Sequence, residues 1–105
     1  MWSHFETEYV AKTPGSRALW PRAQAVFPSG VTHDSRIFEP YPLCIERAAG
    51  CHKWDVDGNE YIDYYGGHGA LLLGHCHPAV VEAVTEQASK GTQFGSSNEM
   101  ELLWA

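Results

Sequence analysis

The sequence has no long hydrophobic run. A membrane-spanning helix needs about 20 consecutive apolar residues, and a run such as Leu71–Leu73 is far too short. The N-terminus also lacks the apolar core of a secretory signal peptide. We therefore expect a soluble cytoplasmic protein that does not bind a membrane.

An excess of basic charge is also missing. The 105 residues include 7 Lys and Arg against 13 Asp and Glu, which gives a formal net charge of -6. Proteins that bind nucleic acid usually carry a basic patch or stripe. The charge balance therefore argues against a nucleic-acid partner, and the length is compatible with one small domain.

Cysteines are few and are not spaced as a disulfide framework. The sequence contains three of them, Cys44, Cys51 and Cys76, which is an odd number. This pattern is typical of reduced thiols inside a cell. A bridge between Cys44 and Cys51 across a hairpin would need Cα atoms about 4.4–6.8 Å apart, and it is the less favoured alternative because disulfides are rare inside cells.

Two segments resemble metal sites but fall short of them. His75-Cys76-His77 offers two histidines, whereas zinc takes roughly three or four protein ligands; we expect His77 to precede a helix as its N-cap and His75 to hydrogen-bond to the backbone. Asp55-Val56-Asp57 resembles the start of a calcium loop. The sixth and twelfth positions from Asp55 hold Glu60 and Gly66 instead of glycine and an acid, so a hairpin turn is the better interpretation.

The strongest local signals that are present lie between residues 53 and 91. Asp57-Gly58 separates two segments rich in β-forming residues and predicts a hairpin. Pro78 suits the first position of a helix and Gly91 suits the position after its end, so a helix is predicted over 78–90. A further helix is expected after Ser96 or Asn98, either of which can cap it.

Together these signals predict an α+β fold: an N-terminal helix, a small three-stranded antiparallel meander, and then helices. The first helix is capped by Ser16 and kinked at Pro21, or begins at Pro21, because an internal proline removes a backbone donor. Residues 1–15 show no sustained period and are interpreted as an N-terminal arm. The strands are expected at Leu43–Ala48, Cys51–Asp55 and Glu60–Tyr64.

Two segments, Trp54–Asp63 and Leu73–Val84, resemble the N-terminal region of the class III aminotransferases, which are fold-type I enzymes dependent on pyridoxal phosphate. Pro28–Val31 followed by Arg36, together with Gly91–Gly95, is most similar to the glutamate-1-semialdehyde aminomutase subgroup. The likeness implies that residues 16–105 are the N-terminal segment of a class III aminotransferase domain whose remainder follows the last residue.

The resemblance also implies where substrate binds. Arg36 matches the arginine that holds the substrate carboxylate in the subgroup, and a guanidinium can form two parallel hydrogen bonds with a carboxylate. From the residues alone, a surface arginine in a loop is the simpler interpretation. His33, Gly67 and His68 match the substrate side of the same site, where the subgroup has serine, serine and tryptophan. The implied partner is a small amino or keto compound that carries a carboxylate, and the implied reaction is that of a transaminase, a mutase or a racemase.

A pyridoxal phosphate enzyme needs a lysine that holds the cofactor as a Schiff base and an acid that faces the pyridine nitrogen. The resemblance implies that both follow the last residue, since Lys12, Lys53 and Lys90 match no such motif. We therefore expect this chain to shape a substrate pocket without catalysing the reaction or holding the cofactor. We expect a homodimer or association with the rest of the enzyme. The alternatives are a non-catalytic interaction module and a small metal-binding domain.

Overall fold

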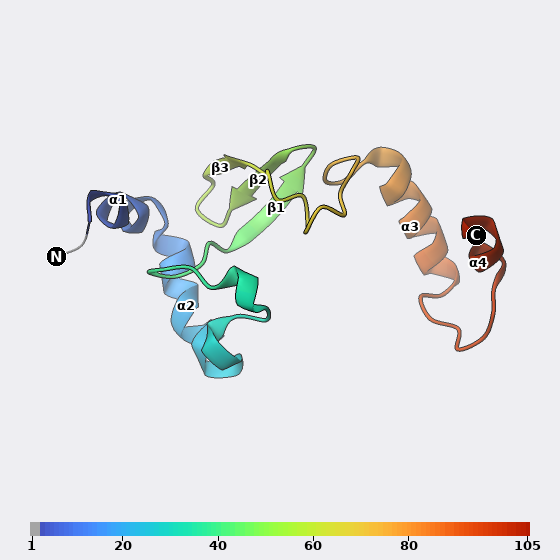
Figure 1. Ribbon diagram of the computed structural model, residues 1–105, viewed down its shortest axis with the longest axis horizontal. Coiled ribbons are helices and arrows are strands. Elements are labelled where there is room, and N and C mark those ends of the chain that lie inside the picture. Colours follow the sequence, from blue (N-terminus) through green and yellow to red (C-terminus); the bar gives the residue numbers. More distant parts are fainter. Residues whose placement is uncertain (1–2) are drawn as a thin grey trace. The chain divides into compact units, whose positions relative to one another are not determined.

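The computed structural model describes residues 3–105. These residues divide into two compact units, a first that ends at His75 and a second that runs Cys76–Ala105. Helices and one small sheet are both present, which confirms the predicted α+β class (Figure 1). None of the helices in the described part of the chain has the length and apolar character needed to cross a membrane.

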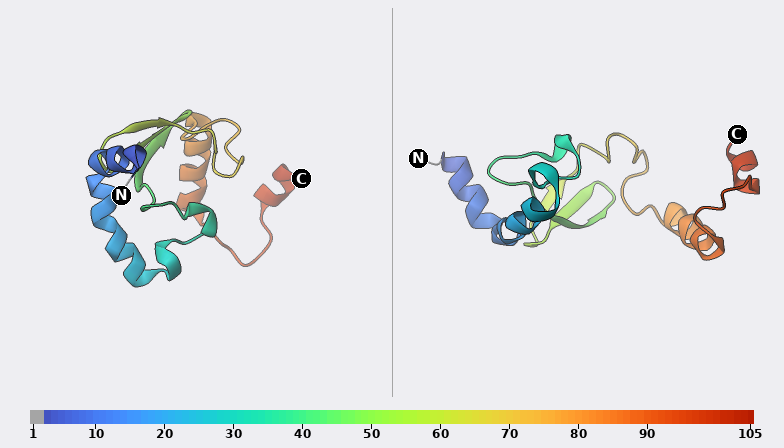
Figure 2. Two further views of the ribbon diagram at one scale, coloured as in Figure 1. Left: turned by 60° about the vertical axis from the view of Figure 1, so that its left-hand side comes forward. Right: turned by 90° about the horizontal axis from the view of Figure 1, so that it is seen from below.

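The first unit begins with helix α1 (His4–Lys12), which lies within the segment predicted as an arm. A capping box starts this helix, because the Ser3 hydroxyl accepts a hydrogen bond from the Glu6 amide and the Glu6 carboxylate accepts one from the Ser3 amide. Thr13 leaves the helical conformation, so the chain bends before the next helix (Figure 2).

Helix α2 (Pro14–Val26) starts earlier than the sequence predicts, so both proposed starts, Ser16 and Pro21, are wrong. Pro14 occupies the first helical turn, where no intrahelical donor is needed. Ser16 lies inside the first turn and is completely buried, where its hydroxyl accepts a hydrogen bond from the Cys44 amide at 3.0 Å. Pro21 lies within the helix.

The cap of α2 comes from a distant part of the chain. Both oxygens of the Asp57 carboxylate accept hydrogen bonds from the first turn, one from the Gly15 amide at 2.6 Å and one from the Ser16 amide at 3.2 Å. A carboxylate at this end of a helix satisfies free amides and interacts favourably with the helix dipole. Asp57 therefore ties the hairpin turn to the start of α2.

Three strands form the sheet: β1 (Ile45–Ala49), β2 (His52–Asp55) and β3 (Glu60–Ile62). They are antiparallel in the order β1-β2-β3, which confirms the predicted meander (Figure 1). Residues 56–59 form the turn between β2 and β3, at the position that Asp57-Gly58 predicts.

The pairing of β1 with β2 shifts between Ile45 and Arg47. Such a shift marks a bulge or irregularity, which interrupts the regular alternation of side chains along the strand. Beyond the bulge Arg47 pairs with Trp54, and its guanidinium carbon lies 3.7 Å from the centre of the indole ring.

Buried side chains of the first unit are mostly polar. Thr13, Ser16 and Asp55 are at most 1% exposed, and Tyr41 is 4% exposed. The Thr13 hydroxyl lies 3.0 Å from the Tyr41 hydroxyl and donates to the Tyr9 carbonyl oxygen at 2.6 Å. Hydrogen bonds, more than an apolar core, therefore connect the helices of this unit to its sheet.

In the second unit, α3 spans Pro78–Lys90, as the sequence predicts, and α4 spans Glu99–Trp104 (Figures 1 and 2). The Asn98 side chain accepts a hydrogen bond from the Met100 amide at 3.0 Å, so Asn98 is the cap of α4. His77 occupies the N-cap position of α3, without a side-chain capping bond.

Candidate functional site

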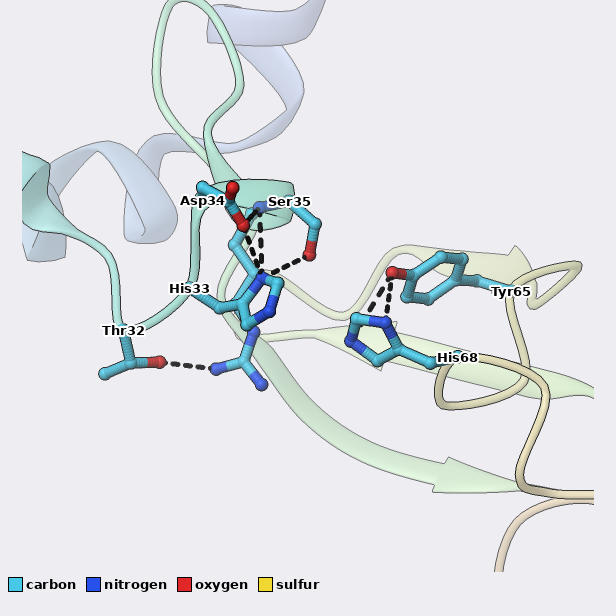
Figure 3. Close-up of polar contacts among 7 residues, drawn as sticks. Thr32, His33, Asp34, Ser35, Tyr65 and His68 are labelled. Atoms are coloured by element: carbon cyan, nitrogen blue, oxygen red, sulfur yellow. Dashed lines mark hydrogen bonds and ion pairs between the residues drawn. The ribbon is translucent and has the colours of Figure 1, made fainter.

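A cavity of about 820 Å³ opens in the first unit, and three of the four predicted site residues, Arg36, Gly67 and His68, line it. His33 is brought to the same place by a ring contact: the imidazoles of His33 and His68 meet edge to face with their centroids 5.4 Å apart (Figure 3). The four residues come from two segments, the loop after α2 and the loop after β3. The structure therefore gathers all four of them, although their roles stay predictions.

Arg36 is the last residue of a short 3-10 helix, Asp34–Arg36. Its side chain is exposed, and its Nη1 donates a hydrogen bond to the Thr32 hydroxyl at 2.7 Å. Among residues 3–105 no Asp or Glu forms an ion pair with this guanidinium. Its charge is thus available to an external carboxylate.

His33 is held at the start of the same 3-10 helix. Its Nδ1 accepts a hydrogen bond from the Ser35 amide at 3.1 Å and lies 2.8 Å from the Ser35 hydroxyl (Figure 3). The Asp34 carboxylate also approaches this nitrogen, at 2.9 Å. Nδ1 of His33 therefore contacts residues of its own loop, and the imidazole ring also contacts His68.

His68 lies in a left-handed turn. Gly66, Gly67, His68 and Gly69 have φ values of 52°, 58°, 62° and 81°. The Gly69 amide closes the turn by donating to the Tyr65 carbonyl oxygen at 3.0 Å. Three of the four positions are glycine, which adopts this conformation freely, whereas another residue there loses about 1–2 kcal/mol.

Sequence reasoning missed a cluster of charged side chains on the same cavity. Asp63, only 3% exposed, accepts hydrogen bonds from Lys53 Nζ at 2.9 Å and from the Tyr65 amide at 3.0 Å. His75 Nε2 lies 2.6 Å from the other oxygen of Asp63. The contacts from His75 and Lys53 hold the pKa of Asp63 well below its usual range.

The prediction for His75 was therefore only half right. Its backbone pairs with Gly50, but its ring contacts the Asp63 side chain instead of the backbone. A signal for part of this cluster was available in the hairpin register. Lys53 pairs with Tyr61, so Asp63 is its diagonal neighbour on the same face, within reach of a long side chain.

All three lysines are engaged in ion pairs. Lys12 pairs with Glu8 at 2.7 Å, Lys53 with Asp63 at 2.9 Å and Lys90 with Glu86 at 2.6 Å.

The histidines and cysteines do not gather around one point. In the part of the chain that the structure describes, no three His, Cys, Asp or Glu side chains are placed to hold one metal ion. Cys44, Cys51 and Cys76 are free thiols. Burial, followed by the negative charge of Asp57, raises the pKa of Cys44 above its usual value.

The fold is that of pyridoxal phosphate-dependent aminotransferases of fold type I. A solved structure described as a transaminase with PLP bound superposes with a TM-score of 0.84 at 36% identity, over 88% of this chain and 22% of that one. An omega-transaminase from Sphaerobacter thermophilus gives a TM-score of 0.81 at 35% identity, over 89% of this chain and 22% of that one. In both comparisons, this chain aligns with about a fifth of the length of the transaminase.

The family model of the class-III aminotransferases matches residues 35–102, and the chain belongs to this family. A glutamate-1-semialdehyde 2,1-aminomutase of Chloroflexus aggregans is 52% identical over 89 residues, which is 82% of this chain and 20% of the relative. The chain thus spans about a fifth of the length of the curated relatives it matches. These matches confirm the resemblance seen in the motifs, including its subgroup and the family's cofactor.

Proposed function

We propose that this chain supplies part of the substrate pocket of a pyridoxal phosphate-dependent aminotransferase or aminomutase, acting on an amino compound that carries a carboxylate. The observation that carries this proposal is Arg36: it lines the cavity together with Gly67 and His68, and no ion pair within residues 3–105 neutralises its guanidinium. An arginine that keeps its charge free at a cavity wall is suited to grip a carboxylate in two places.

The residues of this chain bind and orient the substrate. Arg36 holds the carboxylate, and the ring of His68 offers a hydrogen bond to a polar group nearby. Gly67 lines the cavity and allows the Leu71 side chain to approach closely, because a Cβ at this position would lie 3.2 Å from that side chain. The cofactor, when bound, supplies the electron sink for the chemistry at the reacting carbon. Fixing the substrate in one orientation lowers the entropic cost of reaching the transition state.

Replacing Arg36 by alanine in the complete enzyme is expected to reduce kcat/KM by roughly tenfold to over a hundredfold. One charge-assisted contact is worth about 1.5–3 kcal/mol. The effect is measured with an amino acid substrate and with its carboxamide analogue, and Arg36→Ala should abolish the preference for the acid.

The matched control is Arg22→Ala, which removes an exposed arginine from α2 and should leave both rates unchanged. Kinetics of Arg36→Ala that are indistinguishable from the parent, for both compounds, would remove Arg36 from the substrate site.

The 105-residue chain by itself is expected not to bind pyridoxal phosphate covalently at a defined lysine. Each lysine amine forms an ion pair with a carboxylate, and none of the three lysines lies in a recognisable cofactor motif. The chain is incubated with the cofactor, dialysed, reduced with borohydride and mapped by mass spectrometry, with N-acetyl-lysine as a control for unspecific reaction. A saturable, stoichiometric adduct on one lysine that survives dialysis would contradict this expectation.

We further propose that residues 1–15 form an N-terminal arm and that residues 16–105 belong to a larger aminotransferase domain. The surface of the second unit supports the second of these statements. Val80, Val81 and Val84 on α3 are 47–61% exposed, and Leu102, Leu103 and Trp104 on α4 are 72–91% exposed. Burying one large apolar side chain is worth about 1.5–3 kcal/mol. We infer that the rest of the enzyme or a second copy of the chain covers these side chains.

A further inference from the structure

His68 adopts a left-handed backbone conformation that histidine does not favour, so other contacts must hold it there. It is the single side chain in a left-handed turn whose other three members are glycines. A fourth glycine would adopt the same conformation more easily. A residue held in such a conformation usually marks a functional constraint, provided that its surroundings hold it there.

Tyr65 provides the contact that holds the ring. Its hydroxyl lies 2.6 Å from Nδ1 of His68, and the centroids of the two rings are 4.6 Å apart (Figure 3). The ring also makes an edge-to-face contact with His33, with the centroids 5.4 Å apart. The His68 ring therefore contacts both a tyrosine from its own loop and a histidine from the Arg36 loop.

Tyr65 is itself fixed by a buried group. The Asp63 carboxylate accepts a hydrogen bond from the Tyr65 amide at 3.0 Å, and the same carboxylate contacts Lys53 and His75. The Tyr65 carbonyl oxygen accepts the hydrogen bond that closes the left-handed turn. Both backbone polar groups of Tyr65 are thus occupied, and its hydroxyl reaches the ring from an anchored position.

We propose that Tyr65 is a positioning residue of the substrate pocket, which acts through His68 by fixing the orientation of its imidazole beside Arg36. The inference rests on the proposed function, because it assigns Tyr65 to the pocket in which Arg36 binds a carboxylate. Tyr65 lines the same cavity, and its proposed effect on the carboxylate is exerted through His68. Removing the Tyr65 hydroxyl should therefore matter only while the His68 ring is present.

The first test observes the ring directly. The chain is labelled with ¹⁵N at histidine, and the ring nitrogen shifts are compared in the parent, Tyr65→Phe and Tyr64→Phe; Tyr64 is the matched control because it is 94% exposed. Tyr65→Phe should move the Nδ1 resonance of His68 and leave His4 unchanged, while Tyr64→Phe moves neither. An unchanged His68 resonance in Tyr65→Phe would overturn the proposal.

The second test asks whether the effect reaches the pocket, with acetate as the carboxylate probe and the Arg36 side-chain resonance as the readout. Tyr65→Phe should weaken acetate binding at least threefold, and Tyr64→Phe should not. The same change made in a His68→Gly background should have no further effect, since glycine suits the left-handed turn and the ring is gone.

An equal loss in both backgrounds would show that Tyr65 acts on the fold instead of on His68, and no loss in either would show that it does not act on the pocket; each outcome overturns the proposal. Acetate binding that is absent in the parent, or unaffected by Arg36→Ala, would instead contradict the proposed function. The ring nitrogen shifts then still decide whether Tyr65 holds His68.

Discussion

Replacing Asp55 by alanine is expected to lower the free energy of unfolding by about 3 kcal/mol or more. Asp55 is completely buried and accepts four hydrogen bonds. Its Oδ1 accepts from the amides of Asp57 at 3.0 Å and Asn59 at 2.8 Å, and its Oδ2 accepts from the Asn59 side chain at 2.9 Å and the Tyr61 hydroxyl at 2.8 Å. Alanine leaves several of these donors without a partner, at about 1–3 kcal/mol for each buried group.

The protonation states of Asp55 and Tyr61 agree with the hydrogen bond between them. Burial by itself would raise the pKa of Asp55, but the hydrogen bonds from Asn59 and Tyr61 outweigh it and lower the pKa below its usual value. Burial and the bond to Asp55 together raise the pKa of Tyr61 well above its usual range. The carboxylate is thus charged and the phenol neutral at neutral pH, as the hydrogen bond requires.

Urea denaturation followed by tryptophan fluorescence measures the effect, because Trp54 precedes Asp55 in the same strand. Asp55→Asn should fall between Asp55→Ala and the parent, since the amide keeps one acceptor. Glu46→Ala is the control, as Glu46 is an exposed acid on β1. If Asp55→Ala unfolds at the same urea concentration as Glu46→Ala, the hydrogen-bonded turn does not stabilise the chain.

Asp63→Ala is expected to cost about 3 kcal/mol as well. Its carboxylate is 3% exposed and neutralises Lys53, whose side chain is only 27% exposed. Breaking a buried ion pair by removing one partner leaves the other charge without compensation, at about 3–5 kcal/mol. The partial exposure of Lys53 and His75 places the expected loss at the lower end of this range.

The lowered pKa of Asp63 predicts that the free energy of unfolding falls at acid pH. The pKa of Asp63 is lowered in the folded chain, so its contribution is fully present above the ordinary carboxyl pKa of about 3.9. It is lost as the pH falls below that value toward the folded-state pKa. The parent should therefore lose more stability between pH 6 and pH 3 than Asp63→Asn, in urea denaturation at each pH. Parallel pH dependences of the two chains would contradict this.

Local chemistry explains the elements that could be predicted from the sequence. Helix α3 has the predicted bounds because Pro78 favours its start and Gly91 its end, and both effects act within a turn of the residue concerned. The hairpin around Asp57-Gly58 is local in the same sense. The start of α2 had a local signal in Pro14, but the cap of this helix could not be predicted in this way, because the capping carboxylate is 42 residues away in the sequence.

The sequence by itself determined the family and the α+β class, because motifs and periodic patterns depend on residue type and spacing, and the family resemblance named the candidate residues Arg36, His33, Gly67 and His68. Only the tertiary structure decided that His33 meets His68 and that Asp63 contacts His75. Contacts between distant positions depend on how loops close and on which groups share a buried space. A local sequence pattern is compatible with many such contacts, and the packing of the whole chain selects one set of them.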